Sequence, residues 1–303
     1  MRRIDRLASA AIVSLGLGTS SWASSWASSA ASAQTLPDMR SIQVHGQTIR
    51  YIEAGQGPDL VLLHGLGSSA AFDWGAVIPT LAQRYHVLAM DQLGFGQSAK
   101  PLIAYGVQTW VDMLDGFLKA RHVTRFALDG ESLGGWIAGL YTVEAESNPG
   151  MALPERLILT DAAGHGSIVA TGVHAFSGAA SLSAARAGLL TLFHDPSLVT
   201  PARVQQAFEA RLSEGNQFTQ DSFWKHIDDP STFLDDKVAS ITIPTLIVWG
   251  DDDRLVPLAQ GRDYAAHIKG ARLVVVPQSG HGPAIERPGA YLAAIAPFLN
   301  GLN

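Results

Sequence analysis

The chain has 303 residues, of which 47% are hydrophobic and 16% charged, and its formal net charge is −6. This is the composition of a globular protein rather than of a disordered or collagen-like chain, and the length allows one domain with a subdomain. A mildly acidic chain without a basic run lacks the electrostatic footprint of a nucleic-acid-binding protein. No stretch of about 18 consecutive apolar residues occurs, so we expect no membrane-spanning helix.

The N-terminal segment differs in composition from the rest. Arg2, Arg3 and Arg6 precede a mostly apolar stretch at residues 7–17, and a Ser/Ala-rich tract ends in Ala-Ser-Ala at residues 31–33. This order predicts a secretory signal peptide over residues 1–33, and the alternative is a low-complexity tail. The chain has no cysteine, so an exported form has no disulfides. We expect a periplasmic or secreted protein.

The next segments alternate between strand-like and helix-like patterns. Residues 41–44 and 48–52 alternate apolar and polar side chains around His45-Gly46, which indicates an antiparallel hairpin. Short continuous apolar runs follow at residues 60–63, 87–90, 126–128, 157–159, 246–249 and 273–276. Amphipathic stretches such as 107–118 and 133–143 separate them. The pattern predicts an α/β fold with a doubly wound, mostly parallel sheet.

The alternation is interrupted at residues 164–240, which contain no strand-like run. Residues 181–193 and 201–212 are predicted helical, with Asp195-Pro196 between them. We expect a helical cap over the carboxyl edge of the sheet, flanked by core segments at 34–163 and 241–303; the alternative is ordinary surface helices. The apolar side chains of this segment either form a hydrophobic pocket or pack the cap onto the core; they include Phe176, Leu190, Phe193 and Phe208.

A nucleophile elbow is predicted where the run at 126–128 ends. Residues 130–134 read Gly-Glu-Ser-Leu-Gly and open the predicted helix. Gly130 and Gly134 suit a turn too tight for flanking side chains, and Ser132 lies at its tip. The start of the helix offers free N–H groups and a partial positive charge to a developing oxyanion. A Gly-rich turn without chemistry is the alternative.

A serine nucleophile needs a base and an orienting carboxylate. Three acids, residues 251–253, follow the run at 246–249, and His281 follows the run at 273–276. We predict Asp253 as the acid, with Asp251 and Asp252 as alternatives. The chain order Ser, Asp, His is the one expected for a catalytic triad on this fold.

The run at 60–63 ends in His64-Gly65-Leu66-Gly67. Its position predicts that the backbone N–H of Leu66 supplies a second oxyanion donor beside that of Leu133. For the His64 side chain we favour a structural role, with hydrogen bonds to nearby backbone.

Together these residues resemble the α/β-hydrolase superfamily over nearly the whole chain after Gln43. Residues 91–98 look like its D-x-x-G-x-G-x-S loop, and Gly280-His281 with Glu286 and Pro288 looks like its histidine loop. Residues 250–257 are similar to its G-x-x-D-x-x-x-P acid loop. That resemblance is what singles out Asp253.

Within the superfamily, the chain looks closest to the group of meta-cleavage-product C–C hydrolases and carboxylesterases. Residues 192–200 resemble the cap of the C–C hydrolases, and 134–136 fit the same group. That group generally carries Asn where this chain has Glu131, and often Trp where it has Gly282. It also carries a cap arginine where we align Ala207, with Arg203 and Arg211 about one helical turn to either side. Export fits this group poorly.

The sequence therefore predicts an exported serine hydrolase that cleaves carboxylic esters of small or medium hydrophobic substrates through an acyl-enzyme. The alternatives are C–C bond hydrolysis of meta-cleavage-type diketones, or a lactonase or amidase with the same triad; a non-catalytic binding protein is a further hypothesis. No metal-ligand cluster or phosphate-binding loop stands out, so we expect no metal and no cofactor. The expected partner is a small-molecule substrate, with no nucleic acid and no stable membrane insertion. The sequence does not indicate an oligomeric state.

Overall fold

The centre of the computed structural model is an eight-stranded sheet in the order β1-β2-β4-β3-β5-β6-β7-β8. The strands are β1 (Arg40–Val44), β2 (Gln47–Ala54), β3 (Asp59–Leu63), β4 (His86–Met90), β5 (Phe126–Glu131), β6 (Arg156–Thr160), β7 (Thr245–Gly250) and β8 (Arg272–Val276). Strands β3 to β8 run parallel, and β1 and β2 are antiparallel to their neighbours. The predicted doubly wound, mostly parallel sheet is confirmed.

The structure describes residues 36–166 and 180–302. The predicted signal peptide at 1–33 and Phe176 lie outside the described residues. Within the described part of the chain, no helix is long and apolar enough to cross a membrane.

The hairpin of β1 and β2 forms because its two-residue turn has the right backbone. His45 and Gly46 both have positive φ, at 48° and 75°, which is the conformation that two-residue hairpin loops require. The register pairs Arg40 with Tyr51 and Val44 with Gln47. Strand β2 then pairs with β4 and joins the hairpin to the parallel strands.

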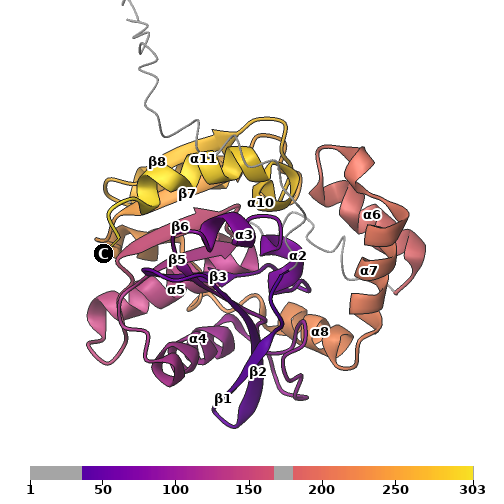
Figure 1. Cartoon of the computed structure of the whole chain (residues 1–303), viewed down its shortest axis with the longest axis horizontal. Coiled ribbons are helices and arrows are strands. Elements are labelled where there is room, and N and C mark those ends of the chain that lie inside the picture. The colour runs from indigo at the N-terminus through magenta and orange to yellow at the C-terminus, as the bar shows by residue number, and fades with distance from the viewer. Residues whose placement is uncertain (1–35, 167–179, 303) are drawn as a thin grey trace, which may run out of the picture. The chain divides into compact units, whose positions relative to one another are not determined.

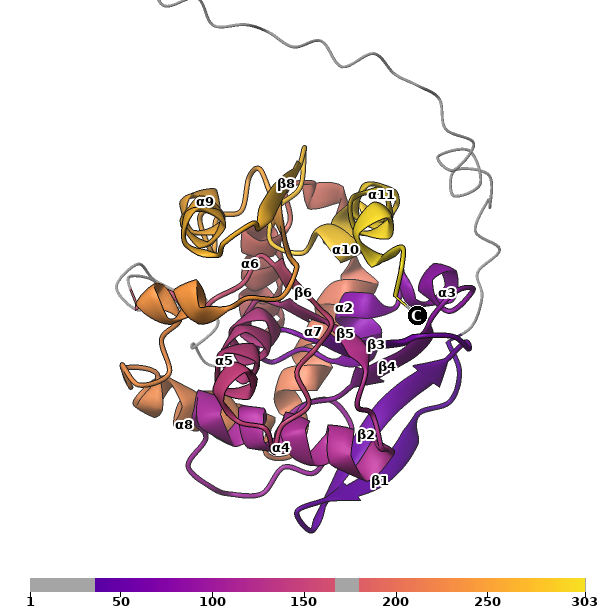
Figure 2. The same ribbon diagram turned by 90° about the vertical axis from the view of Figure 1, so that its left-hand side faces the viewer.

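Helices cover both faces of the sheet, as the doubly wound topology requires (Figures 1 and 2). In Figure 2, α4 (Val107–Arg121), α5 (Leu133–Ser147) and α9 (Leu258–His267) lie on one side, and α3 (Ile78–Leu81) and α11 (Pro288–Leu299) on the other. The short helices α2 (Ala70–Trp74) and α10 (Pro283–Glu286) complete the core. Most strand residues are buried on both faces, which explains the continuous apolar runs.

A helical segment lies between β6 and β7. It contains α6 (Leu182–Leu192), η3 (Pro196–Leu198), α7 (Pro201–Leu212), α8 (Asn216–His226) and η4 (Asp235–Ser240). Both predicted helices begin at a side-chain cap: Ser181 Oγ accepts from the Ala184 N–H, and Thr200 Oγ1 accepts from the Arg203 N–H ahead of Pro201. Asp195 caps η3 at Pro196, so this pair interrupts the helices as predicted.

Helices α6 and α7 share a small apolar cluster of their own. It contains Ala185, Leu189, Phe193, Val199 and Val204, with Leu190 and Phe208 packed against it. Phe72 and Ile285 of the core segments also contact it. These contacts show that the helical segment is packed by Leu190, Phe193 and Phe208. For these three side chains the structure favours the packing interpretation over the hydrophobic pocket.

Candidate active site

Ser132 occupies a sharp turn between β5 and α5. Its backbone has φ 56° and ψ −117°, a conformation that costs energy for a residue other than glycine. Three hydrogen bonds hold it there: Ser132 N–H donates to the Thr160 carbonyl (3.0 Å), and the Ser132 carbonyl accepts from Trp136 and Ala163 N–H groups (3.1 and 2.9 Å). The hydroxyl is thereby presented at the carboxyl end of the sheet.

The glycines flanking Ser132 are required by close approach. A Cβ on Gly130 would collide with the Gly134 carbonyl, and a Cβ on Gly134 would collide with the Leu63 carbonyl. The turn therefore has the tight packing that the Gly-x-Ser-x-Gly spacing predicts.

Asp253 and His281 come together at the same edge of the sheet. His281 Nδ1 lies 2.7 Å from Asp253 Oδ2, and both side chains are almost fully buried. Asp253 Oδ1 accepts the N–H groups of Leu255 and Val256, each at 2.8 Å. These bonds fix the carboxylate so that its second oxygen faces the imidazole.

The two alternative acids are engaged elsewhere. Asp251 Oδ1 accepts the Ser279 N–H at 3.2 Å. Asp252 forms ion pairs with His194 (2.9 Å) and Arg254 (2.5 Å) near the surface. Of the three acids, Asp253 is the one that the structure brings to His281.

The free nitrogen of His281 faces the cavity that Ser132 also lines. His281 Nε2 is buried and has no hydrogen-bond partner among the described residues. Burial alone favours the neutral ring, but the carboxylates of Asp253, Asp161 and Asp73 outweigh it, so the pKa of His281 is raised. The structure contains no Ser132–His281 hydrogen bond, and such bonds commonly tighten only when substrate is bound.

Leu66 and Leu133 lie beside Ser132. Leu133 is the first residue of α5, where backbone N–H groups lack intrahelical acceptors. The loop of Leu66 passes close to the nucleophile, since a Cβ on Gly65 would lie 3.3 Å from Ser132 Cβ. Asp73 Oδ2 fixes this loop by accepting the Gly65 N–H at 2.7 Å. The N–H groups of Leu66 and Leu133 stay the predicted oxyanion donors.

His64 is a structural residue, as expected. It is fully buried, its Nε2 accepts the Gln92 N–H at 3.0 Å, and its Nδ1 lies 2.7 Å from the Gly65 carbonyl. It ties the loop after β3 to the loop after β4.

Sequence reasoning missed a group of buried carboxylates around the nucleophile. Burial raises the pKa of Asp129 to about 7 and those of Glu131 and Asp161 well above their ordinary values, with neighbouring carboxylates adding to the effect for the last two. The sequence held one indication of this group, because Asp161 lies just after the predicted strand at 157–159, at the same edge of the sheet as Ser132. A single acid after a strand belongs to no motif with a characteristic spacing, so the sequence alone did not identify Asp161 as a site residue.

Asp161, Asp253 and His281 also form the one group among the described residues with ligand atoms close enough for a metal, all within 4.8 Å of one another. Both Asp161 oxygens already accept backbone N–H groups, from Gly250 (2.9 Å) and Gly282 (3.0 Å). Asp253 Oδ1 likewise accepts two N–H groups, and its Oδ2 faces His281. This donor set is better described as a hydrogen-bond network.

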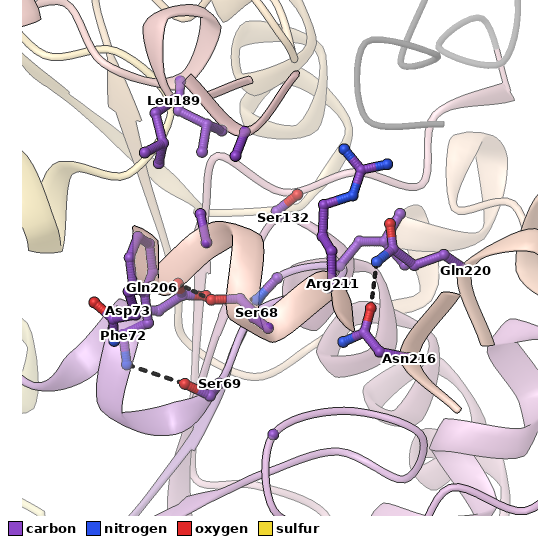
Figure 3. Close-up of a pocket in the computed structure, with 18 of the residues that line it drawn as sticks. Ser68, Ser69, Phe72, Asp73, Ser132, Leu189, Gln206, Arg211, Asn216 and Gln220 are labelled. Atoms are coloured by element: carbon purple, nitrogen blue, oxygen red, sulfur yellow. Dashed lines mark hydrogen bonds between the residues drawn. The ribbon is translucent and has the colours of Figure 1, made fainter. Parts of the chain in front are cut away.

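A cavity of about 260 Å³ opens above Ser132 and His281. Core loops supply one wall, and α6, α7 and the start of α8 supply the other. Figure 3 shows Ser132 between Leu189 on one side and Arg211, Asn216 and Gln220 on the other. Most of the remaining lining is apolar; it includes Leu66, Phe72, Ala184, Leu192, Ala207, Leu255 and Ile285.

A strained serine between the parallel strand β5 and helix α5, with Asp253 after β7 and His281 after β8, is the arrangement typical of an α/β-hydrolase site. A family model described as the alpha/beta hydrolase family matches residues 60–295. The chain belongs to this family and is a hydrolase by fold and relationship, which confirms the resemblance seen in the sequence.

The relatives include several hydrolases of ring-cleavage products. The chain is 28% identical over 272 residues to the 2-hydroxy-6-oxo-6-(2'-aminophenyl)hexa-2,4-dienoic acid hydrolase of Metapseudomonas resinovorans, covering 86% of this chain and 90% of that protein. It is 30% identical over 278 residues to the 2-hydroxymuconate semialdehyde hydrolase of Pseudomonas sp. (strain CF600), covering 88% and 95%. The solved meta-cleavage product hydrolase of Pseudomonas fluorescens IP01 superposes with a TM-score of 0.76 at 27% identity, covering 87% and 98%.

Proposed function

We propose that the protein is a serine hydrolase that cleaves a C–C bond in a dienoate carrying a ketone or aldehyde at the end remote from its carboxylate. This replaces ester hydrolysis, the first expectation from the sequence, with its stated alternative. The names of the two relatives describe such molecules, each with a carboxylate at one end and a second carbonyl several carbons away.

The observation that carries the proposal is the two-ended cavity. Arg211, Asn216 and Gln220 give one side of the cavity a cation and two amides, while Leu189 lies on the other side of Ser132 (Figure 3). Leu192 and Phe72 add to the apolar lining. Arginine binds carboxylates strongly through paired N–H donors. A substrate with its carboxylate at Arg211 and its hydrocarbon substituent at the apolar end would place its remote carbonyl near Ser132.

The proposed chemistry follows from the geometry. His281 Nε2 takes the Ser132 proton as Oγ attacks the carbonyl carbon, and the Leu66 and Leu133 N–H groups receive the oxyanion. For this cleavage the 2-hydroxydienoate must first tautomerise to its 2-oxo form, with the hydroxyl proton moved to the carbon next to the remote carbonyl. The C–C bond then breaks with its electron pair delocalised onto the 2-oxo group, the resulting dienolate takes the proton from His281, and an acyl group stays on Ser132. Water, deprotonated by His281, cleaves this acyl-enzyme to a carboxylic acid. Asp253 holds the imidazole in the required tautomer throughout.

Arg211 and Arg203 offer a matched pair for testing the carboxylate site. Both are on α7, but Arg203 lies over the Phe193 ring (5.5 Å to the centroid) and donates to the Leu198 carbonyl, whereas Arg211 lines the cavity. We expect Arg211→Met to raise KM for a dienoate substrate about 10- to 100-fold, the loss of a charge-assisted hydrogen bond. Arg203→Met should change it less than about threefold.

The deciding assay uses 2-hydroxy-6-oxo-6-phenylhexa-2,4-dienoate and p-nitrophenyl butyrate side by side, with Ser132→Ala as the blank. The proposal requires a larger kcat/KM on the dienoate and a specific loss of it in Arg211→Met. Faster turnover of the ester, unaffected by Arg211→Met, would instead establish an esterase.

Ester hydrolysis remains the second candidate, and Ala207 favours it. This residue lines the cavity where we align the cap arginine of the C–C hydrolases. A small apolar side chain there suits an uncharged acyl group, and the same triad would cleave the ester by the same steps.

We also propose that residues 1–33 direct export and are removed. N-terminal sequencing of protein from the periplasm or medium of an expressing bacterium should give a chain beginning at Gln34. An uncleaved chain confined to the cytoplasm would contradict this proposal.

A further inference from the structure

Asp161 joins the two loops that carry the Asp–His pair. It follows β6 directly, is fully buried, and has a φ of 43°, unusual for a residue with a side chain. Its N–H donates to the Val248 carbonyl of β7 (3.0 Å). Its Oδ1 accepts the Gly250 N–H at the start of the acid loop, and its Oδ2 accepts the Gly282 N–H beside His281.

Asp161 is also close enough to the pair to act on it. One ligand atom each from Asp161, Asp253 and His281 lie within 4.8 Å of one another. Burial and the charge of Asp253 raise the pKa of Asp161, while His281 and the two N–H donors lower it. With Asp253 ionised, Asp161 therefore retains a proton more readily than an exposed acid. Removing Asp253 removes one of the two causes that raise the pKa of Asp161, while burial remains.

We propose that Asp161 is a positioning residue of the triad: it holds the acid loop against the histidine loop, and it takes over the orientation of His281 when Asp253 is removed. The inference rests on the proposed Ser132–His281–Asp253 triad but not on the identity of the substrate.

Two substitutions of Asp253 should then behave differently. In Asp253→Asn, the Leu255 and Val256 N–H groups select the amide oxygen for the Oδ1 place, so the NH₂ group faces His281 Nδ1 and imposes the wrong tautomer. In Asp253→Ala the space is open and Nδ1–H can donate to ionised Asp161. The alanine variant should therefore be the faster of the two.

The test measures the rate of Ser132 labelling by a fluorophosphonate, which needs no substrate. We expect Asp253→Ala to label about 10²-fold more slowly than wild type, rather than the roughly 10⁴-fold loss for a triad without a substitute carboxylate. Adding Asp161→Asn should slow it about 10²-fold further. The control is Asp129→Asn in the Asp253→Ala background. Asp129 is another buried carboxylate, and its oxygens accept hydrogen bonds from the Tyr291 and Thr160 hydroxyls. This substitution should not slow the labelling further.

The pH dependence of the labelling rate distinguishes two roles of Asp161: orienting His281, and only stabilising the fold. In Asp253→Ala, the Asp161 carboxylate should keep the pKa of His281 high. In the double variant that carboxylate is gone, so the labelling rate should fall at a lower pH on the acidic side of its pH profile. Two other ionisable groups face Asp161 and His281: Asp73 acts on His281, and Glu131 acts on Asp161. Neither Asp73 nor Glu131 is substituted in the variants compared.

The proposal is overturned if Asp253→Ala is as slow as Asp253→Asn, a result that does not depend on Asp161 variants folding. It is also overturned if the folded double variant labels as fast as Asp253→Ala or has the same acidic limb. If wild type labels but does not cleave the dienoate, the proposed function fails while this inference remains testable.

Discussion

At the scale of residues, the site depends on carboxyl groups held away from water. Burying an ionised carboxylate without partners is costly, so each such group is either paired or takes up a proton. Asp253 is paired with His281 and two N–H donors. Glu131 instead has a buried oxygen, Oε2, for which the described residues offer no hydrogen bond, and its pKa is raised well above the ordinary value by burial and by neighbouring carboxylates. Burial and the neighbouring carboxylates thus favour the protonated form of Glu131, the residue next to Ser132 in the chain.

The choice of catalytic acid gives a direct prediction from two adjacent residues. Asp253→Asn should lower the rate of Ser132 labelling about 10⁴-fold because His281 is held in the wrong tautomer. Asp252→Asn removes only a partly exposed ion pair and should change the rate less than about threefold. A larger loss in the Asp252 variant would show that the acid is wrongly assigned.

The raised pKa of His281 sets the acidic limit of activity. The base must be neutral, so kcat/KM should fall as the pH drops through the pKa of His281. Because the surrounding carboxylates raise that pKa, the midpoint of the limb should lie above the ordinary histidine value of about 6.5. A profile of kcat/KM from pH 5 to 9 measures it, and a midpoint below that value would contradict the electrostatic description.

Asp129 makes a prediction about stability. Its pKa is about 7 in the folded protein because it is buried, against 3.8 for an ordinary aspartate. The folded state thus binds this proton more tightly than the unfolded state does. The contribution of Asp129 to the free energy of unfolding is therefore lost as the pH rises from the unfolded pKa of 3.8 to the folded pKa of about 7. Asp129→Asn removes this dependence, so its stability relative to wild type should improve by roughly 2 kcal/mol between pH 5.5 and 8. Urea unfolding at both values measures the change, and a constant difference would contradict it.

At the scale of elements, the end of α6 is bonded directly to the histidine loop. The Leu192 carbonyl accepts the His281 N–H at 2.7 Å. The buried carboxylate of Glu286 accepts three N–H groups, from Gly280 (2.7 Å), Asp195 (2.6 Å) and His194 (3.2 Å). The end of α6, which lines the cavity above Ser132, is therefore bonded directly to the loop that carries His281.

Removing this connection should cost stability. Glu286→Ala leaves three N–H groups without their charged acceptor, and we expect a loss of about 3 kcal/mol in the free energy of unfolding. Asp195→Ala is the control, because the side chain of Asp195 caps η3 and its loss should cost about 1 kcal/mol. Equal losses in urea unfolding would show that Glu286 contributes no more than a local cap.

At the scale of the whole molecule, the predictable features are those with local sequence signals. Each continuous apolar run became a parallel strand, and the glycine spacing located the turn at Ser132. Helix α8 was not predicted, because its polar residues are buried by distant partners: Ser222 Oγ accepts the Tyr105 N–H at 2.9 Å. Asp161 was missed for the same reason, since its partners come from two remote loops.

The extent of the folded unit supplies the last prediction. The described residues, 36–166 and 180–302, belong to one compact unit. A chain that begins at Gln34 should therefore match the full chain in melting temperature and labelling rate. A chain that begins at Gln47 lacks β1. Its absence exposes the edge of β2 and the side of α4 that packs on β1. The melting temperature of this chain should fall by several degrees, about 2–4 °C for each kcal/mol of stability lost. Because the chain has no cysteine, neither result should change with reductant. A destabilised chain from Gln34 would mean that residues 1–33 belong to the fold, and would overturn their proposed role in export.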